Sequence, residues 1–217
     1  MKSIVVLISG GGSNLQAIMD HIETQRLDIT ISLVLSNQKE ALGLERAAKA
    51  GITTTVVDHS KYTSRELFDQ AMIARIDPHK PDLIVMAGFM RILSSEFINH
   101  YANRMINIHP SLLPAYKGLH THQRALSDKA THHGATVHYV ALELDAGEGI
   151  LQGQVPIFES DDECSLQKRV HRIEHIIYPE VIEWFAKGRL ACRSGEVYLD
   201  NTRLDRPVII EQSPDHY

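Results

Sequence analysis

The sequence has little cysteine, no long apolar run and no surplus of positive charge. Cys164 and Cys192 are its only cysteines and lie 28 positions apart, so they do not form the close pair typical of a zinc site. This low content argues against a disulfide-stabilised secreted fold. No stretch approaches the roughly 18 apolar residues that a membrane helix needs, and the apolar run at the N-terminus is too short for a signal peptide. We therefore expect a cytoplasmic protein that does not bind membranes.

The charge balance argues against a general nucleic-acid partner. The formal net charge is −5 and the isoelectric point is near 6.2, whereas nucleic-acid binders normally carry a basic patch or stripe. Hydrophobic residues make up 43% and charged residues 23% of the 217 residues, which is typical of a globular protein. We expect a single domain over residues 1–217, with halves at 1–110 and 111–205 and a loosely held tail at 206–217.

Apolar runs alternate with helical patterns through the first 110 residues. The expected strands cover 3–9, 31–36, 53–58, 81–88 and 105–109. The expected helices cover 13–27, 42–51, 64–76 and 94–102, the last capped by a serine and the second ended by Gly51. This alternation predicts an α/β fold with a doubly wound, mostly parallel, Rossmann-like sheet.

The alternation stops in the second half of the chain. Residues 135–144 and 149–158 are neighbouring strand candidates with no long helix between them, which favours antiparallel or mixed pairing. A long helix is predicted over 165–188, where Pro179 is expected to kink or interrupt it. A small hairpin is predicted around Ser194 and Gly195.

The glycine turn SGGGSN at residues 9–14 lies where the first strand passes into a helix. Backbone N–H groups and the helix dipole at such a turn can hold a phosphate. The turn lacks the lysine of a P-loop and the third glycine of a dinucleotide fingerprint, so an NAD site is disfavoured. The structural alternative is a tight connection in which Ser13 caps the helix.

The strand at 105–109 has the sequence MINIH, which places Asn107 and His109 on one face. Pro110 ends the strand, so both polar residues lie near its carboxyl end, where open α/β sheets bind ligands. An edge strand with one wet face would give the same alternation.

Asp145 follows another predicted strand, in the glycine-containing loop LELDAGEG. An amide, an imidazole and a carboxylate can stabilise an oxyanion and move a proton without a metal. Since no serine or cysteine is obviously placed as a nucleophile, direct transfer is favoured over an acyl-enzyme.

The remaining histidines allow a metal centre as an alternative. His120 and His122 follow a Pro/Gly loop without a cysteine or carboxylate at a usual ligand spacing, so they are expected to line a pocket or cap a helix. His132 and His133 are expected in an exposed loop. His138 shares a strand face with Thr136 and Val140, and could support Asp145 or hydrogen-bond in the core.

Several long stretches carry a family resemblance. MAGFMRIL (86–93), NIHPSLLPAYKGLHTHQRAL (107–126) and GATVHYVALELDAGEGILQ (134–152) resemble the phosphoribosylglycinamide formyltransferases, folate-dependent formyltransferases of purine synthesis. ISGGGSNLQAI and RIEHIIYPEVIEWFAKGRL match too, so the likeness covers nearly the whole chain. It implies transfer of the formyl group of 10-formyltetrahydrofolate to the amine of glycinamide ribonucleotide, with no metal, in a monomer or homodimer.

The resemblance also assigns roles by position. It implies a catalytic trio of Asn107, His109 and Asp145. The first half would bind the nucleotide phosphate through Gly12, Ser13 and Asn14, with Arg65 as a weaker contact. Glu174, in the second half, would contact the glycinamide group. The residues implied at the folate site are Met90, Arg91, Ile92, Leu93 and Val140, and those implied as supporting residues are His138, Thr136, His120 and His122.

The same trio occurs in related enzymes, so other readings stay open. A formyltetrahydrofolate hydrolase would be expected to carry an extra N-terminal domain, and a methionyl-tRNA formyltransferase a C-terminal RNA-binding domain. A non-catalytic nucleotide-binding module would explain the glycine turn alone. The chain also departs from many relatives after Asp145, where two glycines and a proline are replaced by Ala146, Gly147, Glu148 and Gly149. Glu148 is expected to add a carboxylate near Asp145.

Overall fold

The computed structural model describes residues 1–24 and 27–211. The chain divides into two compact units, Met1–Asn107 and Ile108–Tyr217. Among the described residues, no helix combines the length and apolar character needed to cross a membrane. The expected single domain, with halves that meet near residue 110, stays a prediction.

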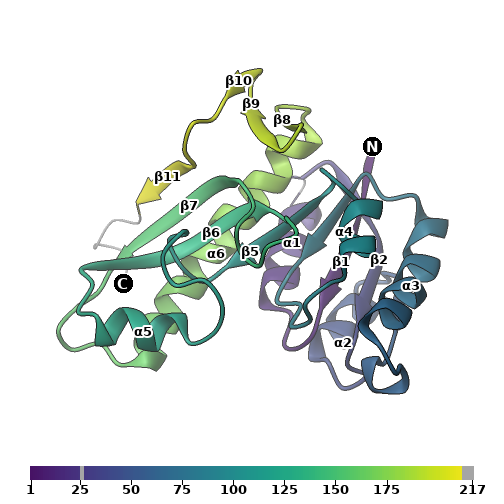
Figure 1. Cartoon of the computed structure of the whole chain (residues 1–217), viewed down its shortest axis with the longest axis horizontal. Coiled ribbons are helices and arrows are strands. Elements are labelled where there is room, and N and C mark those ends of the chain that lie inside the picture. Colours follow the sequence, from purple (N-terminus) through teal and green to yellow (C-terminus); the bar gives the residue numbers. More distant parts are fainter. Residues whose placement is uncertain (25–26, 212–217) are drawn as a thin grey trace. The chain divides into compact units, whose positions relative to one another are not determined.

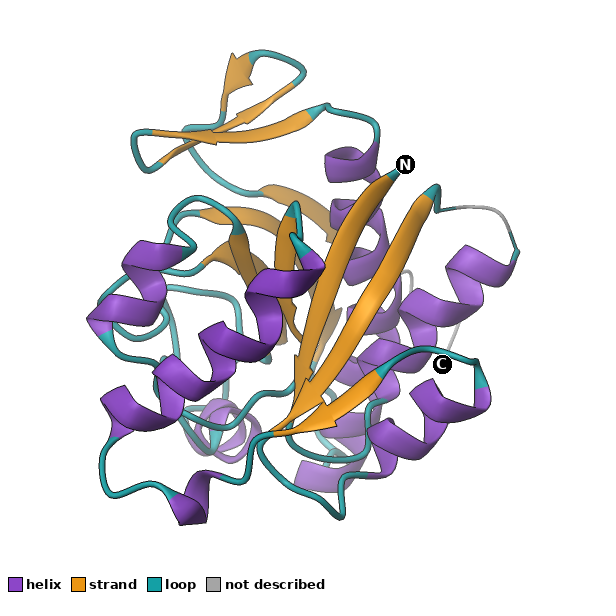
Figure 2. Cartoon of the chain, turned by 90° about the vertical axis from the view of Figure 1, so that its right-hand side faces the viewer, coloured by secondary structure: helices purple, strands orange, loops and turns teal. Residues whose placement is uncertain are grey.

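The first unit is built on a parallel sheet with the strand order β5-β4-β1-β2-β3. Its strands are β1 (Lys2–Ile8), β2 (Ile29–Ser36), β3 (Thr54–Val56), β4 (Leu83–Met86) and β5 (Met105–His109). Residues 4–8 of β1 and all of β4 are buried, because both faces of the sheet are covered. Figure 2 shows helices on both sides of these strands. The predicted doubly wound parallel sheet is confirmed.

Two of the four α-helices described in the first unit begin at a serine cap. The α-helices are α1 (Ser13–Glu23), α2 (Leu42–Lys49), α3 (Arg65–Ile76) and α4 (Ser95–His100), with 3₁₀ turns η1 (His59–Lys61) and η2 (Asp77–His79). The side chain of Ser94 accepts a hydrogen bond from Phe97 N, so the predicted serine cap is confirmed. The alternative in which Ser13 caps α1 is wrong. Gly12 occupies that position with φ 71°, and no side chain caps α1.

The second unit combines mixed strands with one long helix. Strand β6 (His132–Tyr139) pairs antiparallel with β7 (Gly149–Pro156), and β11 (Val208–Glu211) pairs parallel with β7. Helix α6 (Glu163–Ala186) runs along β6 and β7 (Figure 1). A Cβ on Gly153 would lie 2.2 Å from Ile173 Cγ1, so this glycine allows the helix to approach the strand closely.

Three expectations about this unit are wrong. Helix α6 continues through Pro179, so the expected interruption is absent, and the alternative of a kink stays a prediction. Strand β6 ends at Tyr139 instead of residue 144. Part of the expected loose tail forms β11, because its backbone completes hydrogen bonds on β7; residues 212–217 lie outside the described residues. The sequence also gave no sign of α5 (Thr121–Ser127), which is short and has no side-chain cap.

A small antiparallel sheet follows α6. It contains β8 (Leu190–Arg193), β9 (Glu196–Leu199) and β10 (Thr202–Arg203). Ser194 and Gly195 join β8 to β9 with φ values of 52° and 83°, as a two-residue hairpin turn requires. The predicted hairpin is confirmed.

A buried pair of imidazoles lies in the second unit. His133 Nε2 is 3.1 Å from His122 Nδ1, and the two side chains belong to residues only 1% and 7% exposed. The expectation of an exposed loop at 132–133 is wrong for the loop, since both residues lie in β6, and for His133, which is buried; His132 is exposed as expected. Burial lowers the pKa of His122 and of His133 to about 4, so both rings are neutral near pH 7.

This pair predicts a loss of stability in acid. Between pH 6.5 and about 4 the unfolded chain binds protons at these histidines that the folded chain does not. The free energy of unfolding should therefore decrease as the pH falls through that range, by roughly 2 kcal/mol per histidine at pH 5. Urea titrations at pH 7 and pH 5 should show a smaller decrease in His133→Gln than in the unsubstituted chain. The matched change His132→Gln, at the exposed neighbour, should leave the decrease intact; an equal decrease in all three proteins would contradict this account.

Candidate active site

His109, at the end of β5, is buried with both ring nitrogens facing protein groups. Its Nε2 lies 3.0 Å from the main-chain oxygen of Tyr116. Its Nδ1 lies 3.4 Å from Asp145 Oδ2, and the two side chains are 8% and 7% exposed. The structure therefore brings together two members of the predicted trio, from the end of β5 and from the loop after β6.

The hydrogen bonds around His109 fix how protons are arranged. A carbonyl oxygen can only accept, so His109 Nε2 carries a hydrogen that it donates to Tyr116. A neutral ring would then present an unprotonated Nδ1 to Asp145 Oδ2. At 3.4 Å the two atoms lie close enough to exchange a proton when one is present. The arrangement therefore suits proton transfer to or from a reacting group.

Asp145 is held in a tightly folded loop. Its Oδ2 also accepts a hydrogen bond from Gly118 N at 3.0 Å, and its backbone is left-handed, with φ 50°. A Cβ on Gly147 would lie 1.7 Å from the carbonyl oxygen of Tyr139, so only glycine permits the loop to fold back onto the end of β6. Asp145 lies six residues beyond the strand, whereas the sequence suggested the strand's end.

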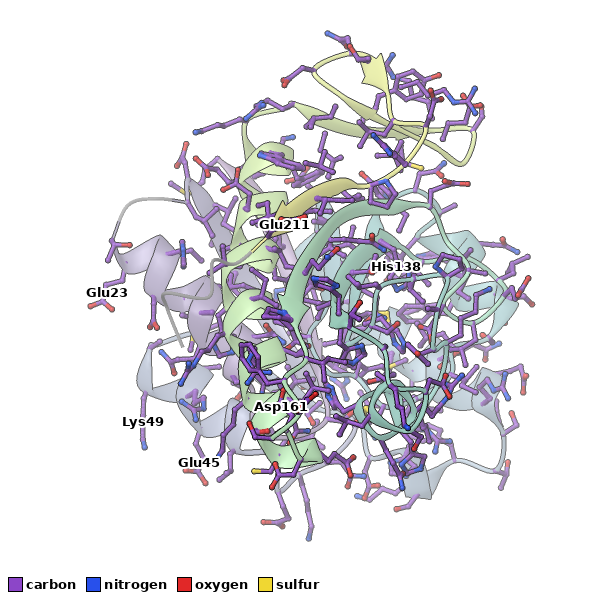
Figure 3. All side chains as sticks on the ribbon, turned by 90° about the vertical axis from the view of Figure 1, so that its left-hand side faces the viewer. Glu23, Glu45, Lys49, His138, Asp161 and Glu211 are labelled. Atoms are coloured by element: carbon purple, nitrogen blue, oxygen red, sulfur yellow. The ribbon has the colours of Figure 1, made fainter. Side chains whose placement is uncertain are left out.

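His138 hydrogen-bonds within the core, which is one of the two roles that the sequence left open, and its support of Asp145 stays a prediction. Its Nδ1 donates to Tyr139 O at 2.9 Å, which leaves Nε2 to face Asp145 Oδ1 at 3.9 Å. Burial lowers the pKa of His138, so the ring is neutral. Figure 3 labels His138 on the ribbon of the strands, and Asp161 near the start of α6. Because His138 is neutral, His109 is the one of these two histidines that can face Asp145 as a cation.

Thr136 joins the segment after His109 to β6. Its hydroxyl donates to Ser111 O at 2.7 Å and accepts from Leu113 N and Gln152 Nε2, both at 3.0 Å. This fully buried group fixes the start of the loop that carries Tyr116 and Gly118. Thr136 therefore has a position that suits its predicted supporting role.

His120 and His122 lie at the start of α5 but do not act as caps. His120 occupies the N-cap position with φ 58° and forms no side-chain cap. His122 is buried against His133 instead. Among residues 1–24 and 27–211 no group of three potential metal-binding side chains is found.

Asn107 precedes His109 by two positions on β5, and it is half-buried beside Met86 of β4. Period-two alternation gives the two residues the same side of the strand. Asn107 is the last residue of the first unit. That its side chain meets Asp145 in one site stays a prediction.

The glycine turn of the first unit is closed by α2. A Cβ on Gly12 would lie 2.7 Å from Gly43 Cα, and Gly43 N donates to Gly10 O at 3.1 Å. Arg46 Nε donates to Gly11 O at 2.9 Å, which leaves the main-chain N–H groups of the turn as the groups available to an anion. Ser13 is exposed at the first position of α1, and Asn14 is buried.

The segment predicted to contact a flat ligand presents two apolar side chains to solvent. Met90 is 65% and Ile92 56% exposed, and Arg91 is exposed as well, whereas Leu93 is buried. The other predicted contacts are dispersed: Arg65 is exposed in the first turn of α3, Val140 is half-buried after β6, and Glu174 is buried in α6. The side chain of Glu148 is exposed, and its influence on Asp145 stays a prediction.

Sequence reasoning missed the groups that hold the trio. The carbonyl of Tyr116, the N–H of Gly118 and the missing side chain of Gly147 all act through the backbone. In the sequence, these contacts were signalled only by two glycines. They are Gly118, whose φ is 78° in the structure, and Gly147, two positions after Asp145.

Known proteins are similar to this chain in sequence and in fold. The formyl transferase family matches residues 2–182. The chain is 52% identical to the phosphoribosylglycinamide formyltransferase of Escherichia coli, over 93% of this chain and 95% of that protein. It is 43% identical to the human trifunctional purine biosynthetic protein adenosine-3, over 85% of this chain but 18% of that protein. The solved phosphoribosylglycinamide formyltransferase of Coxiella burnetii is 49% identical and superposes with a TM-score of 0.91, covering 95% of this chain and 99% of that one. The chain belongs to the formyl transferase family.

Proposed function

We propose that this enzyme transfers the formyl group of 10-formyltetrahydrofolate to the amine of glycinamide ribonucleotide, in purine biosynthesis. The observation that carries the proposal is the buried His109–Asp145 pair at the end of β5, whose Nδ1 and Oδ2 atoms lie 3.4 Å apart. The 52% identity to the Escherichia coli phosphoribosylglycinamide formyltransferase, over nearly the whole of both chains, supports the choice of substrates.

In the proposed mechanism, the neutral amine attacks the formyl carbon directly. A C–N bond forms, the carbonyl oxygen becomes an oxyanion, and Asn107 and His109 donate hydrogen bonds to it. The tetrahedral intermediate then collapses, the bond to the folate nitrogen breaks, and that nitrogen receives a proton. Asp145 assists by carrying the proton lost from the amine toward the leaving nitrogen, directly or through water.

The contacts of His109 add a detail to this mechanism. The Nε2 hydrogen is donated to the carbonyl of Tyr116. A developing oxyanion is a stronger acceptor than a neutral carbonyl, so it would compete for this hydrogen as negative charge builds up. The contact with Asp145 would stabilise the imidazolium form that makes the donation strongest.

The first unit offers groups suited to the rest of the two substrates. The glycine turn at residues 10–12 and the start of α1, which includes Asn14, suit the ribonucleotide phosphate, and Arg65 on α3 is a weaker candidate contact. Exposed Met90 and Ile92 suit a flat pterin ring. The reaction needs no metal. A cytoplasmic enzyme that acts as a monomer or homodimer is part of this proposal.

One absorbance assay tests the substrate assignment. Purified protein with 10-formyltetrahydrofolate should convert it to tetrahydrofolate only when glycinamide ribonucleotide is added. Conversion without the acceptor would support a hydrolase instead. No conversion in either case would leave the glycine turn as a nucleotide-binding site without catalysis.

Asp145→Asn should lower kcat by on the order of a hundredfold or more, because an amide cannot exchange a proton with His109. His109→Ala should have an effect of similar size. Steady-state rates at saturating substrates provide the measurement, and Asp200→Asn, which removes an exposed ion pair with Arg189, is the matched control. Near-normal turnover in Asp145→Asn would refute its catalytic role.

Gly147→Ala should reduce turnover without touching a reacting group. The added Cβ would collide with the carbonyl of Tyr139, so the loop must move and carry Asp145 away from His109. We expect a loss of kcat approaching that of Asp145→Asn, while far-ultraviolet circular dichroism stays unchanged. Ala146→Ser, on the same loop, should keep most of the activity. Equal turnover in both variants would show that the loop's close fold is not required.

A further inference from the structure

A single hydroxyl in the first unit connects three segments that are distant in sequence. Ser9 is the residue after β1 and the first residue of the glycine turn. Its Oγ donates to Asn37 Oδ1 at 2.5 Å and accepts a hydrogen bond from Met90 N at 2.8 Å. The main-chain N–H of Ser9 also donates to Gly88 O at 3.1 Å. Ser9 therefore holds the turn predicted to bind phosphate and the segment predicted to bind folate.

Asn37 fixes the direction of the hydroxyl. This residue follows β2, is 1% exposed, and places its Nδ2 3.3 Å from His59 Nδ1 on η1. The main-chain oxygen of Asn37 lies 3.1 Å from the same His59 Nδ1. The main-chain N–H of Met90 can only donate, so Ser9 Oγ accepts from it, and the single hydrogen of the hydroxyl goes to Asn37 Oδ1.

The segment 90–93 is held at both ends, and Ser9 forms the first of the two attachments. At the other end, Ser94 N donates to Asp69 Oδ2 at 2.5 Å. Between these points the side chains of Met90 and Ile92 are more than half exposed, whereas Leu93 is buried. The hydrogen bond to Ser9 Oγ therefore holds the backbone of Met90 where its own side chain does not pack in the core.

We propose that Ser9 is a positioning residue that aligns the phosphate-binding turn with the folate-binding segment, so that each substrate's site depends on the other's backbone. This inference rests on the proposed function. It assigns Ser9 no contact with either substrate and no part in proton transfer. Its loss should consequently weaken the binding of both substrates and leave the chemical step largely intact.

The test compares Ser9→Ala with a matched control. Ser32→Ala also removes a half-buried hydroxyl from this sheet, where it donates to Ile4 O at 3.2 Å, but it touches neither segment. We expect Ser9→Ala to raise KM for both substrates about five- to tenfold, with kcat changed less than about threefold. Ser32→Ala should leave both KM values unchanged. Ser9→Thr, which keeps the hydroxyl, should restore values close to those of the unsubstituted enzyme.

Amide hydrogen exchange gives a readout that does not depend on activity. In Ser9→Ala the amide of Met90 loses its acceptor, so its exchange should accelerate about tenfold or more, whereas Ser32→Ala should not change it. If Ser9→Ala does not fold, Ser9→Cys keeps the side chain's size with a weak hydrogen-bonding group and should show the same pattern at smaller amplitude.

The outcomes separate this inference from the function beneath it. Active unsubstituted enzyme combined with unchanged KM values and unchanged Met90 exchange in Ser9→Ala would overturn the role of Ser9 alone. A rise in only one KM would also overturn it, because alignment affects both substrates. Absence of formyl transfer by the unsubstituted enzyme would overturn the proposed function and this inference together.

Discussion

The close approach of His109 to Asp145 is the constraint on which the site depends. Because the carbonyl of Tyr116 takes the Nε2 hydrogen, the ring turns its second nitrogen toward Asp145 Oδ2, 3.4 Å away. The loop from residue 110 to 120 therefore does two things. It supplies the carbonyl that fixes the ring, and through Gly118 N it supplies a hydrogen bond that holds Asp145. Thr136 in turn fixes the start of that loop on β6.

Much of the fold could be predicted because it follows from periodic burial. β1 and β4 are buried on both faces, and their continuous apolar runs indicate strands of a covered parallel sheet. Ser94 shows its capping role in sequence, because the helix start beside it has few other acceptors. His109 could be singled out because a polar residue at the buried end of an apolar strand is costly unless it serves a purpose, whereas Asp145 was placed at a strand end that the structure does not have.

The rest depended on long-range backbone contacts that no local pattern encodes. β6 ends at Tyr139 because the loop folds back there. The close approach is visible only in the structure, where a Cβ on Gly147 would clash with the Tyr139 carbonyl. His133 appeared to belong to a loop, since two adjacent histidines resemble an exposed turn, yet β6 begins one residue earlier. Val208–Glu211 became a strand because β7 had hydrogen-bonding groups to pair, which is a property of a partner 50 or more positions away.

Several other histidines of the second unit are buried, and burial keeps them neutral. His122, His133 and His138 have lowered pKa values because burial disfavours their charged forms, and each has a ring nitrogen hydrogen-bonded to a neutral partner. They can therefore fill the region around His109 without adding positive charge. If His138 were cationic, it would face Asp145 at 3.9 Å and compete with His109 for the carboxylate. Neutral neighbours thus leave His109 as the single imidazole paired with Asp145, so a proton moved at this site would pass between one pair and the substrate instead of spreading over a cluster.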